Sequence, residues 1–316
     1  MPPSPNTLAT REASRRPLVA VVSDRVDWHS RQLMGAFASQ GADAVPVRLS
    51  HCAFATAHRH GLHLEGLGER LPDAVIVRTI SGGTFEAVTL RLGLLHALRE
   101  LGVLVWNDAR AVERCVDKSM TSFLMARAGI ATPDTWAMES PAAARAIVRR
   151  EAAHGPLVLK PLFGSQGRGL SLIRSEDDLP DPSRMAGVYY LQRFVAVERD
   201  GFRDFRLFVS QGRVIAAMAR HSASWITNVK HGGKPVAVVA DGEMKDLAVR
   251  AVAAVGADFA GVDILHGADG RATVLEVNSM PAWSGLQKVT RTNIAESLAA
   301  DLIAALSARA ALEASA

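Results

Sequence analysis

Short apolar runs alternate with helical patterns along the first third of the chain. The run LVAVVS begins at Leu18, a helix is predicted over residues 30–40, and the run DAVIVR covers residues 73–78. Over residues 84–101, apolar positions recur at three- and four-residue steps, which predicts an amphipathic helix leading into the strand VLVWN. This alternation indicates parallel strands joined by crossover helices, so residues 17–109 are predicted to form a small α/β domain.

The pattern changes after residue 110. A helix near residues 118–128 ends at Gly129, and a second, rich in Ala and Arg, is predicted over residues 142–153. Short strands follow (LVLKP, GLSLI, VYYLQRF), and then a hairpin, FRLFVSQGRVIAAMAR, with a tight turn at Gln211-Gly212. A helix at 242–255, the strands AGVDIL and TVLEVN and a terminal helix at 293–308 complete an α+β half with antiparallel strands.

Composition narrows the classes of function. A chain of 316 residues with 48% apolar and 22% charged residues can bury a full core and is expected to be globular. The net charge of +4 comes without a Lys/Arg run or aromatic-basic interleaving, which predicts no nucleic-acid partner and suits anionic small substrates. Residues 1–16 are expected to be a flexible leader without the apolar core of a signal peptide, and no membrane segment is predicted. Cys52 and Cys115 have no CxxC spacing, so we expect neither disulfides nor zinc, and a reducing cytoplasm.

A lysine beside a glycine-rich loop is the first chemical feature. Lys160 lies near a strand end and is followed by Gly164, Gly167 and Gly169. Glycine lets backbone N–H groups approach phosphate oxygens, and an ammonium there can neutralise phosphates. The spacing GxxGxG differs from the Walker and Rossmann loops, and no kinase HRD or DFG motif is present. Taken alone, a hairpin loop without ligand is the alternative reading.

The second feature is a set of oxygen ligands. Strand alternation in TVLEVN predicts Glu276 and Asn278 on one face, with Leu275 and Val277 on the other. Asp263 lies in the apolar strand AGVDIL, where a buried carboxylate needs a partner. These hard oxygen donors suit Mg²⁺ that bridges nucleotide phosphates, the alternative being a solvated sheet face.

Three further groups are less distinctive by themselves. Asp204, Arg206 and Arg220 lie on the hairpin, where the arginines suit a phosphoryl group or a carboxylate; a surface salt-bridge set is the alternative. Lys118 in CVDKSM reads as a solvated lysine without further context. The histidines within residues 51–63 fit no recurring metal-ligand spacing and are interpreted as a polar loop.

Six ordered segments change this picture together. They are DK at 117–118, VLKPLFGSQGRG at 158–169, LQRFV at 191–195, DFRLFV at 204–209, GVDIL at 261–265 and LEVNSMP at 275–281. In this order they resemble the ATP-grasp superfamily, specifically the RimK-like α-L-glutamate ligases. The segments RTISGGTFEAV, NDARAVERCVDK and SWITNVKHGG look closest to cofactor-glutamylating members of the tetrahydromethanopterin glutamate ligase type.

The resemblance implies an ATP-grasp fold preceded by the α/β domain at 17–109. A central subdomain at 110–186 would carry the glycine loop, and a C-terminal subdomain at 187–316 would carry the metal site. ATP and Mg²⁺, with two ions expected and Mn²⁺ as a substitute, are the implied cofactors. The residues implied to bind the nucleotide are Lys118, Lys160, Gly164, Ser165, Gln166, Gly167, Gly169, Gln192, Arg193, Phe194, Val195 and Asp204. Those implied to be catalytic are Arg206, Arg220 and Asn228, and the implied metal ligands are Asp263, Glu276 and Asn278.

The implied activity is a carboxylate–amine ligase that forms an acyl-phosphate and adds L-glutamate to a carboxylate-bearing acceptor. Two positions depart from the family pattern: Arg193 replaces a common hinge Glu, and Ile226 stands where an Arg is usual, which suggests a different acceptor from that of the ribosomal-protein ligase. Glutamylation of a protein C-terminus, a non-catalytic ATP-binding scaffold and a small-molecule kinase remain alternatives. RimK-like ligases often form dimers or tetramers, so the resemblance also implies a homo-oligomer.

Overall fold

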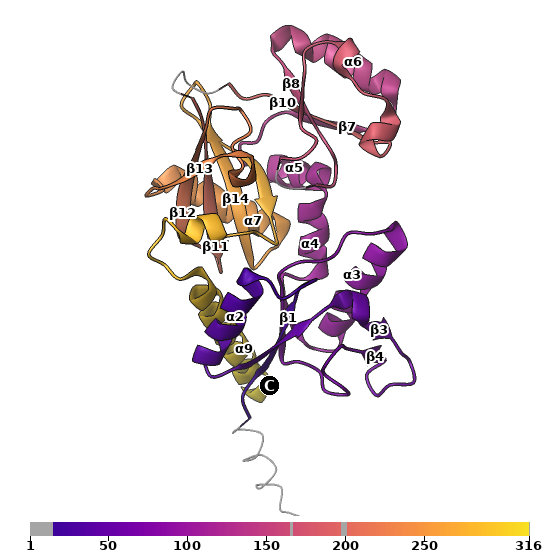
Figure 1. The fold of residues 1–316 in the computed structure, drawn as a ribbon, viewed down its shortest axis with the longest axis vertical. Helices are drawn as coiled ribbons and strands as arrows, with labels where there is room; N and C mark the ends of the chain where they lie inside the picture. The colour runs from indigo at the N-terminus through magenta and orange to yellow at the C-terminus, as the bar shows by residue number, and fades with distance from the viewer. Residues whose placement is uncertain (1–14, 165–166, 197–200, 316) are drawn as a thin grey trace, which may run out of the picture. The chain divides into compact units, whose positions relative to one another are not determined.

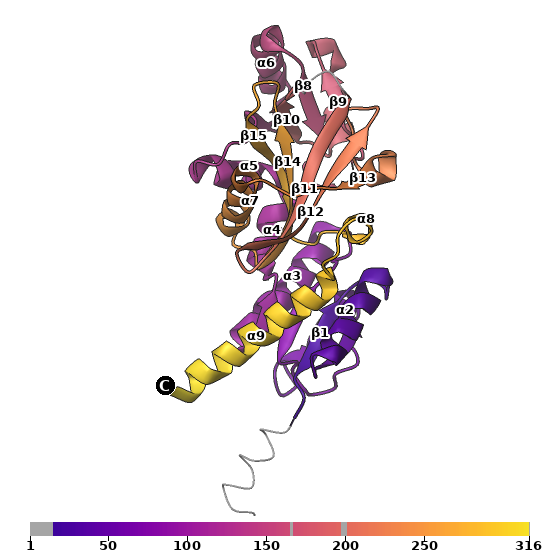
Figure 2. The ribbon, with the colours of Figure 1, turned by 90° about the vertical axis from the view of Figure 1, so that its left-hand side faces the viewer.

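The computed structural model describes residues 15–164, 167–196 and 201–315. Its chain forms two compact units, one of residues 1–109 with 295–316 and one of residues 110–294 (Figures 1 and 2). No helix in the described parts of the chain is long and apolar enough to span a membrane.

A parallel sheet forms the centre of the first unit. Its strand order is β2-β1-β5-β6, with bounds Asp43–Val47, Leu18–Val22, Ala74–Val77 and Leu104–Trp106. Every residue of β1 and β5 is buried, as expected of parallel strands covered on both faces. Helices α2 (Trp28–Ser39) and α9 (Ile294–Ser315) lie on one side and α3 (Phe85–Glu100) on the other (Figures 1 and 2). The short elements are η1 (Leu49–His51), β3 (Ala53–Phe54) and β4 (Leu62–His63).

Helix α9 differs from its predicted place. It belongs to the compact unit of the N-terminal sheet, whereas the sequence interpretation placed it with residues 187–316. Ile303 and Leu306 line a shared groove with Leu71 and Val103 of that unit, so apolar burial holds the helix there. The helix also extends seven residues beyond the predicted end at Ala308, because ARAALEAS consists mainly of strong helix formers.

The second unit begins within α4 (Ala109–Val116), continues with α5 (Lys118–Arg127) and contains two antiparallel sheets. The smaller sheet has the order β7-β10-β8-β9, with bounds Thr135–Met138, Tyr189–Arg193, Leu157–Lys160 and Ser171–Ile173. Helix α6 (Pro141–Glu151) packs on one face, where Ala144 and Val148 meet Leu157, Leu159 and Leu191. The connecting turns are η2 (Ala152–His154), η3 (Glu176–Asp178) and η4 (Pro182–Met185).

The larger sheet has the order β13-β12-β11-β14-β15. The bounds are Lys234–Ala237, Arg213–Ser222, Phe202–Ser210, Phe259–His266 and Ala272–Asn278. Helix α7 (Gly242–Val255) buries Leu247, Ala251 and Val255 against its core face. The predicted turn at Gln211 and Gly212 is present, both residues having positive φ (45° and 69°). The remaining elements are η5 (Val229–His231) and α8 (Ser284–Gln287).

Candidate active site

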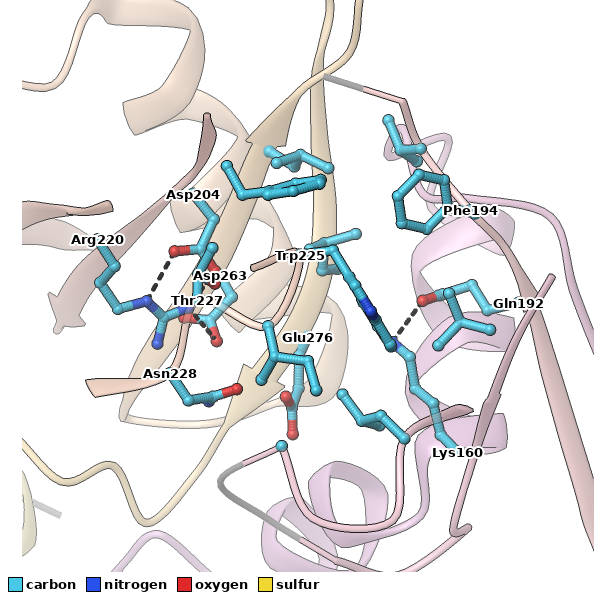
Figure 3. Close-up of a pocket in the computed structure, with 18 of the residues that line it drawn as sticks. Lys160, Gln192, Phe194, Asp204, Arg220, Trp225, Thr227, Asn228, Asp263 and Glu276 are labelled. Carbon is cyan, nitrogen blue, oxygen red and sulfur yellow. Dashed lines mark hydrogen bonds and ion pairs between the residues drawn. The ribbon is translucent and has the colours of Figure 1, made fainter. Parts of the chain in front are cut away.

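One pocket of the second unit gathers most of the residues that the sequence singled out (Figure 3). Strands of both antiparallel sheets contribute to its wall, together with helix α5 and the segment between β12 and β13. The predicted residues among its lining are Lys118, Lys160, Gly164, Gly167, Gln192, Arg193, Phe194, Val195, Asp204, Arg220, Asn228, Asp263 and Glu276. Gly169, Arg206 and Asn278 are not among the lining residues, and Ser165 and Gln166 lie outside the described residues.

Two lysines from different elements face this pocket. Lys160 is the last residue of β8, and its Nζ donates to Oε1 of Gln192 at 2.5 Å (Figure 3). Lys118 is the first residue of α5, just after the N-cap Asp117, and its Nζ donates to the carbonyl oxygens of Leu162 and Gly164 at 3.3 and 2.9 Å. The loop that follows β8 is therefore tied to α5.

Burial lowers the pKa of both lysines. The pKa of Lys160 falls to about 8, although the carboxylate of Glu276 acts in the opposite direction. The pKa of Lys118 is lowered by the same cause, again opposed by Glu276 and by Asp117. Two ammonium groups removed from water in one pocket form a site that an anionic ligand would stabilise.

The glycine loop closely approaches the segment after β12. Gly167 has φ +73°, and a Cβ placed on it would lie 2.5 Å from Oδ1 of Asn228 and 2.9 Å from Cγ2 of Ile226. Only glycine fits this backbone conformation and this gap. Ile226, at which the resemblance implied an Arg, thus contacts the loop with an apolar side chain.

Opposite charges alternate across the β11–β12 hairpin and β14. Asp204 receives two hydrogen bonds from Arg220, of which the Nε bond is 2.7 Å long (Figure 3). Arg220 also contacts Asp263 at 3.0 Å, and Arg206 donates to both oxygens of Asp263 at 2.7 and 2.6 Å. Burial alone would raise the pKa of the Asp263 carboxyl, but the two arginines outweigh burial and hold this pKa below its usual range.

Asp204 was predicted to bind the nucleotide. Its two carboxylate oxygens accept from Arg220, and the side chains of Asp204 and Arg220 are almost fully buried. The observed arrangement therefore makes Asp204 a partner of Arg220.

A β-bulge places Glu276 beside Asp263. These two residues are opposite one another on β15 and β14, while the next pair is Val274 with Ile264, so Leu275 is an extra residue on β15. Leu275 lines the pocket together with Glu276, whereas strict alternation predicted it on the other face. Val274 and Val277 fill the core on both sides of the bulge. Asn278 lies opposite Gly261.

The donor set of this pair suits a divalent cation. Within the described chain, no group of three or more His, Cys, Asp or Glu side chains could hold a metal by itself. Mg²⁺ is usually held by only one or two carboxylates and completes its octahedron with phosphates and water. The carboxylates of Asp263 and Glu276, both lining the pocket that contains the two lysines, fit that requirement.

Residues 192–195, at the end of β10, contribute an aromatic wall to the pocket. Phe194 packs edge-to-face with Trp225, with ring centroids 6.1 Å apart (Figure 3). Sequence reasoning missed Trp225; a tryptophan in the polar stretch between two strands was the available signal. The Arg193 guanidinium donates to Glu151 of α6 and lies over the Trp136 ring at 5.8 Å. The arginine that replaces the expected Glu is therefore held by contacts within the smaller sheet and α6.

Sequence comparisons identify the family of this chain. The RimK-like ATP-grasp domain matches residues 115–302. The chain belongs to the RimK-like ATP-grasp family. The tetrahydromethanopterin:α-L-glutamate ligase of Methanosarcina acetivorans is 31% identical over 313 aligned residues, covering 87% of this chain and 95% of that protein. A probable α-L-glutamate ligase of Alkalilimnicola ehrlichii is also 31% identical, over 87% of this chain and 91% of its own length.

Solved structures show the same ATP-grasp fold. The ATP-grasp ligase PsnB, in a complex with a phosphomimetic variant of its minimal precursor, Mg and ADP, has a TM-score of 0.72 at 23% identity, over 91% of this chain and 98% of that chain. The D-cycloserine synthetase DcsG has a TM-score of 0.67 at 18% identity, over 92% and 99%. The predicted fold, family and ligase class are confirmed.

Proposed function

We propose that this ATP-grasp ligase uses ATP and Mg²⁺ to join L-glutamate to a carboxylate-bearing small molecule through an acyl-phosphate. The main support for this proposal is the pocket that combines Lys118 and Lys160 with the carboxylates of Asp263 and Glu276. Cations that bind phosphate and carboxylates that bind Mg²⁺ are what phosphoryl transfer requires. A cofactor-like acceptor is proposed because three relatives at 31–33% identity are named tetrahydromethanopterin:α-L-glutamate ligases.

The nucleotide would occupy the pocket with its phosphates at Lys118 and Lys160. Its base would lie toward the aromatic pair Phe194 and Trp225, at the end of β10. Asp263 and Glu276 would hold Mg²⁺, and Asn278 would supply a further oxygen ligand. When bound, Mg²⁺ would neutralise charge on the phosphate oxygens. Two Mg²⁺ ions, replaceable by Mn²⁺, are part of the proposal.

The proposed ligation has two chemical steps. An acceptor carboxylate oxygen attacks the γ-phosphorus as the bond to ADP breaks, which gives an acyl-phosphate. The unprotonated glutamate amine then attacks the acyl carbon, phosphate leaves and the nitrogen loses a proton to solvent. Arg220, held by Asp204 and Asp263, would stabilise the charge on the transferred phosphoryl oxygens. Asn228, which contacts the glycine loop, can orient the same group.

The chemistry needs no side-chain nucleophile. Positioning, charge stabilisation and water exclusion by the glycine loop provide the catalysis. Ile226 lines the pocket with an apolar side chain where the resemblance implies an Arg, and this difference would favour an acceptor other than that of the ribosomal-protein ligase.

The test is ADP release by the purified protein with Mg-ATP, L-glutamate and a panel of acceptors. The panel contains glutamylated pterin and furan cofactors, a ribosomal-protein tail peptide and aminoadipate carriers. We expect glutamate-dependent ADP and phosphate release with one cofactor-type acceptor. The double variant Asp263→Ala/Glu276→Ala should abolish it, whereas Asp246→Ala, on the exposed face of α7, should not.

Other outcomes separate the alternatives. Turnover with the tail peptide alone would assign protein glutamylation. A stable phosphoester formed without glutamate would indicate a kinase, and tight ATP binding without turnover on any acceptor or amino acid would indicate a scaffold.

A further inference from the structure

A buried hydrogen-bond chain runs from Lys160 to helix α5. The Lys160 Nζ donates to Gln192 Oε1 at 2.5 Å, and Gln192 Nε2 donates to the Tyr190 hydroxyl at 3.3 Å. The Tyr190 hydroxyl bonds in turn to Oγ of Ser122 at 2.8 Å. Gln192, Tyr190 and Ser122 are 2%, 1% and 6% exposed, so water does not supply alternative partners.

The strand register explains why these side chains meet. Tyr190 and Gln192 are two residues apart on β10 and therefore share one face of the sheet. Tyr190 lies directly opposite Lys160 of β8, which puts the lysine on that face too. Tyr189 and Leu191 point to the opposite face, into the core under α6.

The chain ends on the helix that carries the second pocket lysine. Ser122 follows Lys118 by four residues on α5, about one helical turn. The same network thus joins the strand that presents Lys160 to the helix that presents Lys118.

The donors and acceptors allow one arrangement at Gln192. Because an ammonium only donates, the amide oxygen must face Lys160, and the amide nitrogen must then donate toward Tyr190. Thr135 Oγ1 offers that nitrogen a second acceptor, at 3.4 Å. An apolar side chain at 192 would provide neither bond, and a carboxylate could provide only the first.

We propose that Gln192 and Tyr190 are positioning residues that fix the Lys160 ammonium for nucleotide phosphate and, through Ser122, its placement relative to Lys118. This inference rests on the proposed nucleotide site and assigns the Gln192 side chain to the lysine, where the resemblance had implied a contact with the nucleotide. Loss of the network should weaken nucleotide binding without unfolding the protein.

The chain offers a matched control. Tyr189, next to Tyr190, is also buried, and its hydroxyl donates to the carbonyl of Pro180 at 2.7 Å, on the other face. Tyr190→Phe and Tyr189→Phe each remove one buried hydroxyl from the same strand. Only the first touches the Lys160 network.

The experiment is ADP binding by calorimetry with the full-length protein from pH 7 to pH 10. Tyr190→Phe should weaken binding by about fivefold and Gln192→Met by at least about tenfold, while Tyr189→Phe stays within about twofold. Gln192→Met should move the alkaline midpoint of binding to lower pH, since the ammonium loses its acceptor. Gln192→Glu should move it to higher pH, because a carboxylate stabilises the ammonium.

The outcomes separate the inference from the proposed function. A wild-type protein that binds no ADP would overturn both. Wild-type binding that Tyr190→Phe and Tyr189→Phe weaken equally, with an unmoved pH midpoint in the Gln192 variants, would overturn the inference alone. If Gln192→Met fails to fold, the comparison of Tyr190→Phe with Tyr189→Phe and the pH midpoint of Gln192→Glu still test the inference.

Discussion

The carboxylate of Asp204 stabilises the pocket because it compensates the buried positive charge of Arg220. It is 4% exposed and its partner Arg220 is 2% exposed, so neither can be solvated if the other is removed. Removing one member of a buried pair leaves an uncompensated charge in a medium of low dielectric constant. Arg220 keeps Asp263 as a partner, but Asp263 is shared with Arg206.

We expect Asp204→Asn to lower the free energy of unfolding by about 3 kcal/mol, measured by urea denaturation. Asp246→Asn is the control, because the Asp246–Arg250 pair on α7 has side chains 63% and 45% exposed and should contribute under about 0.5 kcal/mol. Equal losses in the two variants would contradict the assigned role of Asp204.

We expect Lys160 to make nucleotide binding depend on pH. Its pKa is lowered from 10.5 to about 8, so between those values the free protein holds fewer protons at this site than the unfolded chain does. The contribution of this group to stability therefore increases as pH rises through that window. Phosphate beside the ammonium would reverse the shift.

At pH 9, ADP binding should accordingly take up a proton fraction approaching roughly one, and affinity should fall as pH rises further. Calorimetry in two buffers with different heats of ionisation measures this uptake. Lys160→Met should bind more weakly and without the uptake; an unchanged proton count in this variant would assign the titration to another group.

At the scale of elements, the close contact between the glycine loop and the β12–β13 segment can be tested by adding one methyl group to the loop. Gly167→Ala places its methyl group against Asn228 and Ile226, so the loop must withdraw. We expect KM for ATP to rise at least about tenfold while the melting temperature changes little. Gly187→Ala controls for backbone strain, since Gly187 also has positive φ (81°) but nothing within 4 Å. Similar kinetics in both variants would argue against a closing role for the contact.

Local pattern predicted most elements of the second unit well. Helix α7 was predicted with its observed bounds, because Asp241 caps its start by accepting from the Met244 N–H and Gly256 ends it in a left-handed conformation. The edge strand β2, with Pro46 and mixed exposure, lacked a clear apolar pattern and was not predicted. The bulge at Leu275 was missed because register is decided by the partner strand.

For the candidate site, the sequence supplied the residue types but not their pairing. Lys118, Lys160, Asp263 and Glu276 were named from motifs, and the structure places them around one pocket. The links between Asp204, Arg220 and Asp263 join three different strands, and no local pattern specifies such contacts. Tyr190 and Ser122 escaped notice for the same reason.

At the scale of the whole molecule, the first unit is built from both ends of the chain. Residues up to 109 supply its sheet, and α9 supplies a helix after the entire second unit has intervened. Three residues of α9 are fully buried, which are Leu298, Ala299 and Leu302. Apolar contacts therefore stabilise the packing of α9 in the first unit.

Leu302→Ala should therefore destabilise the first unit by about 2–5 kcal/mol. Hydrogen exchange should show faster exchange in β1 and β5, with β11 and β14 unchanged. Leu312→Ala, on the same helix but 73% exposed, should have no measurable effect. Faster exchange in β11 as well would show that the two units unfold together.

The division of the first unit also determines when each part can be completed during protein synthesis. Domains generally fold as units from the N-terminus as the ribosome releases them. Here residues 110–294 are continuous and can finish first, while the sheet made earlier waits for the last helix. A nascent chain stalled before α9 would leave uncovered the apolar surface of the N-terminal unit that Leu298, Ala299 and Leu302 bury in the complete protein.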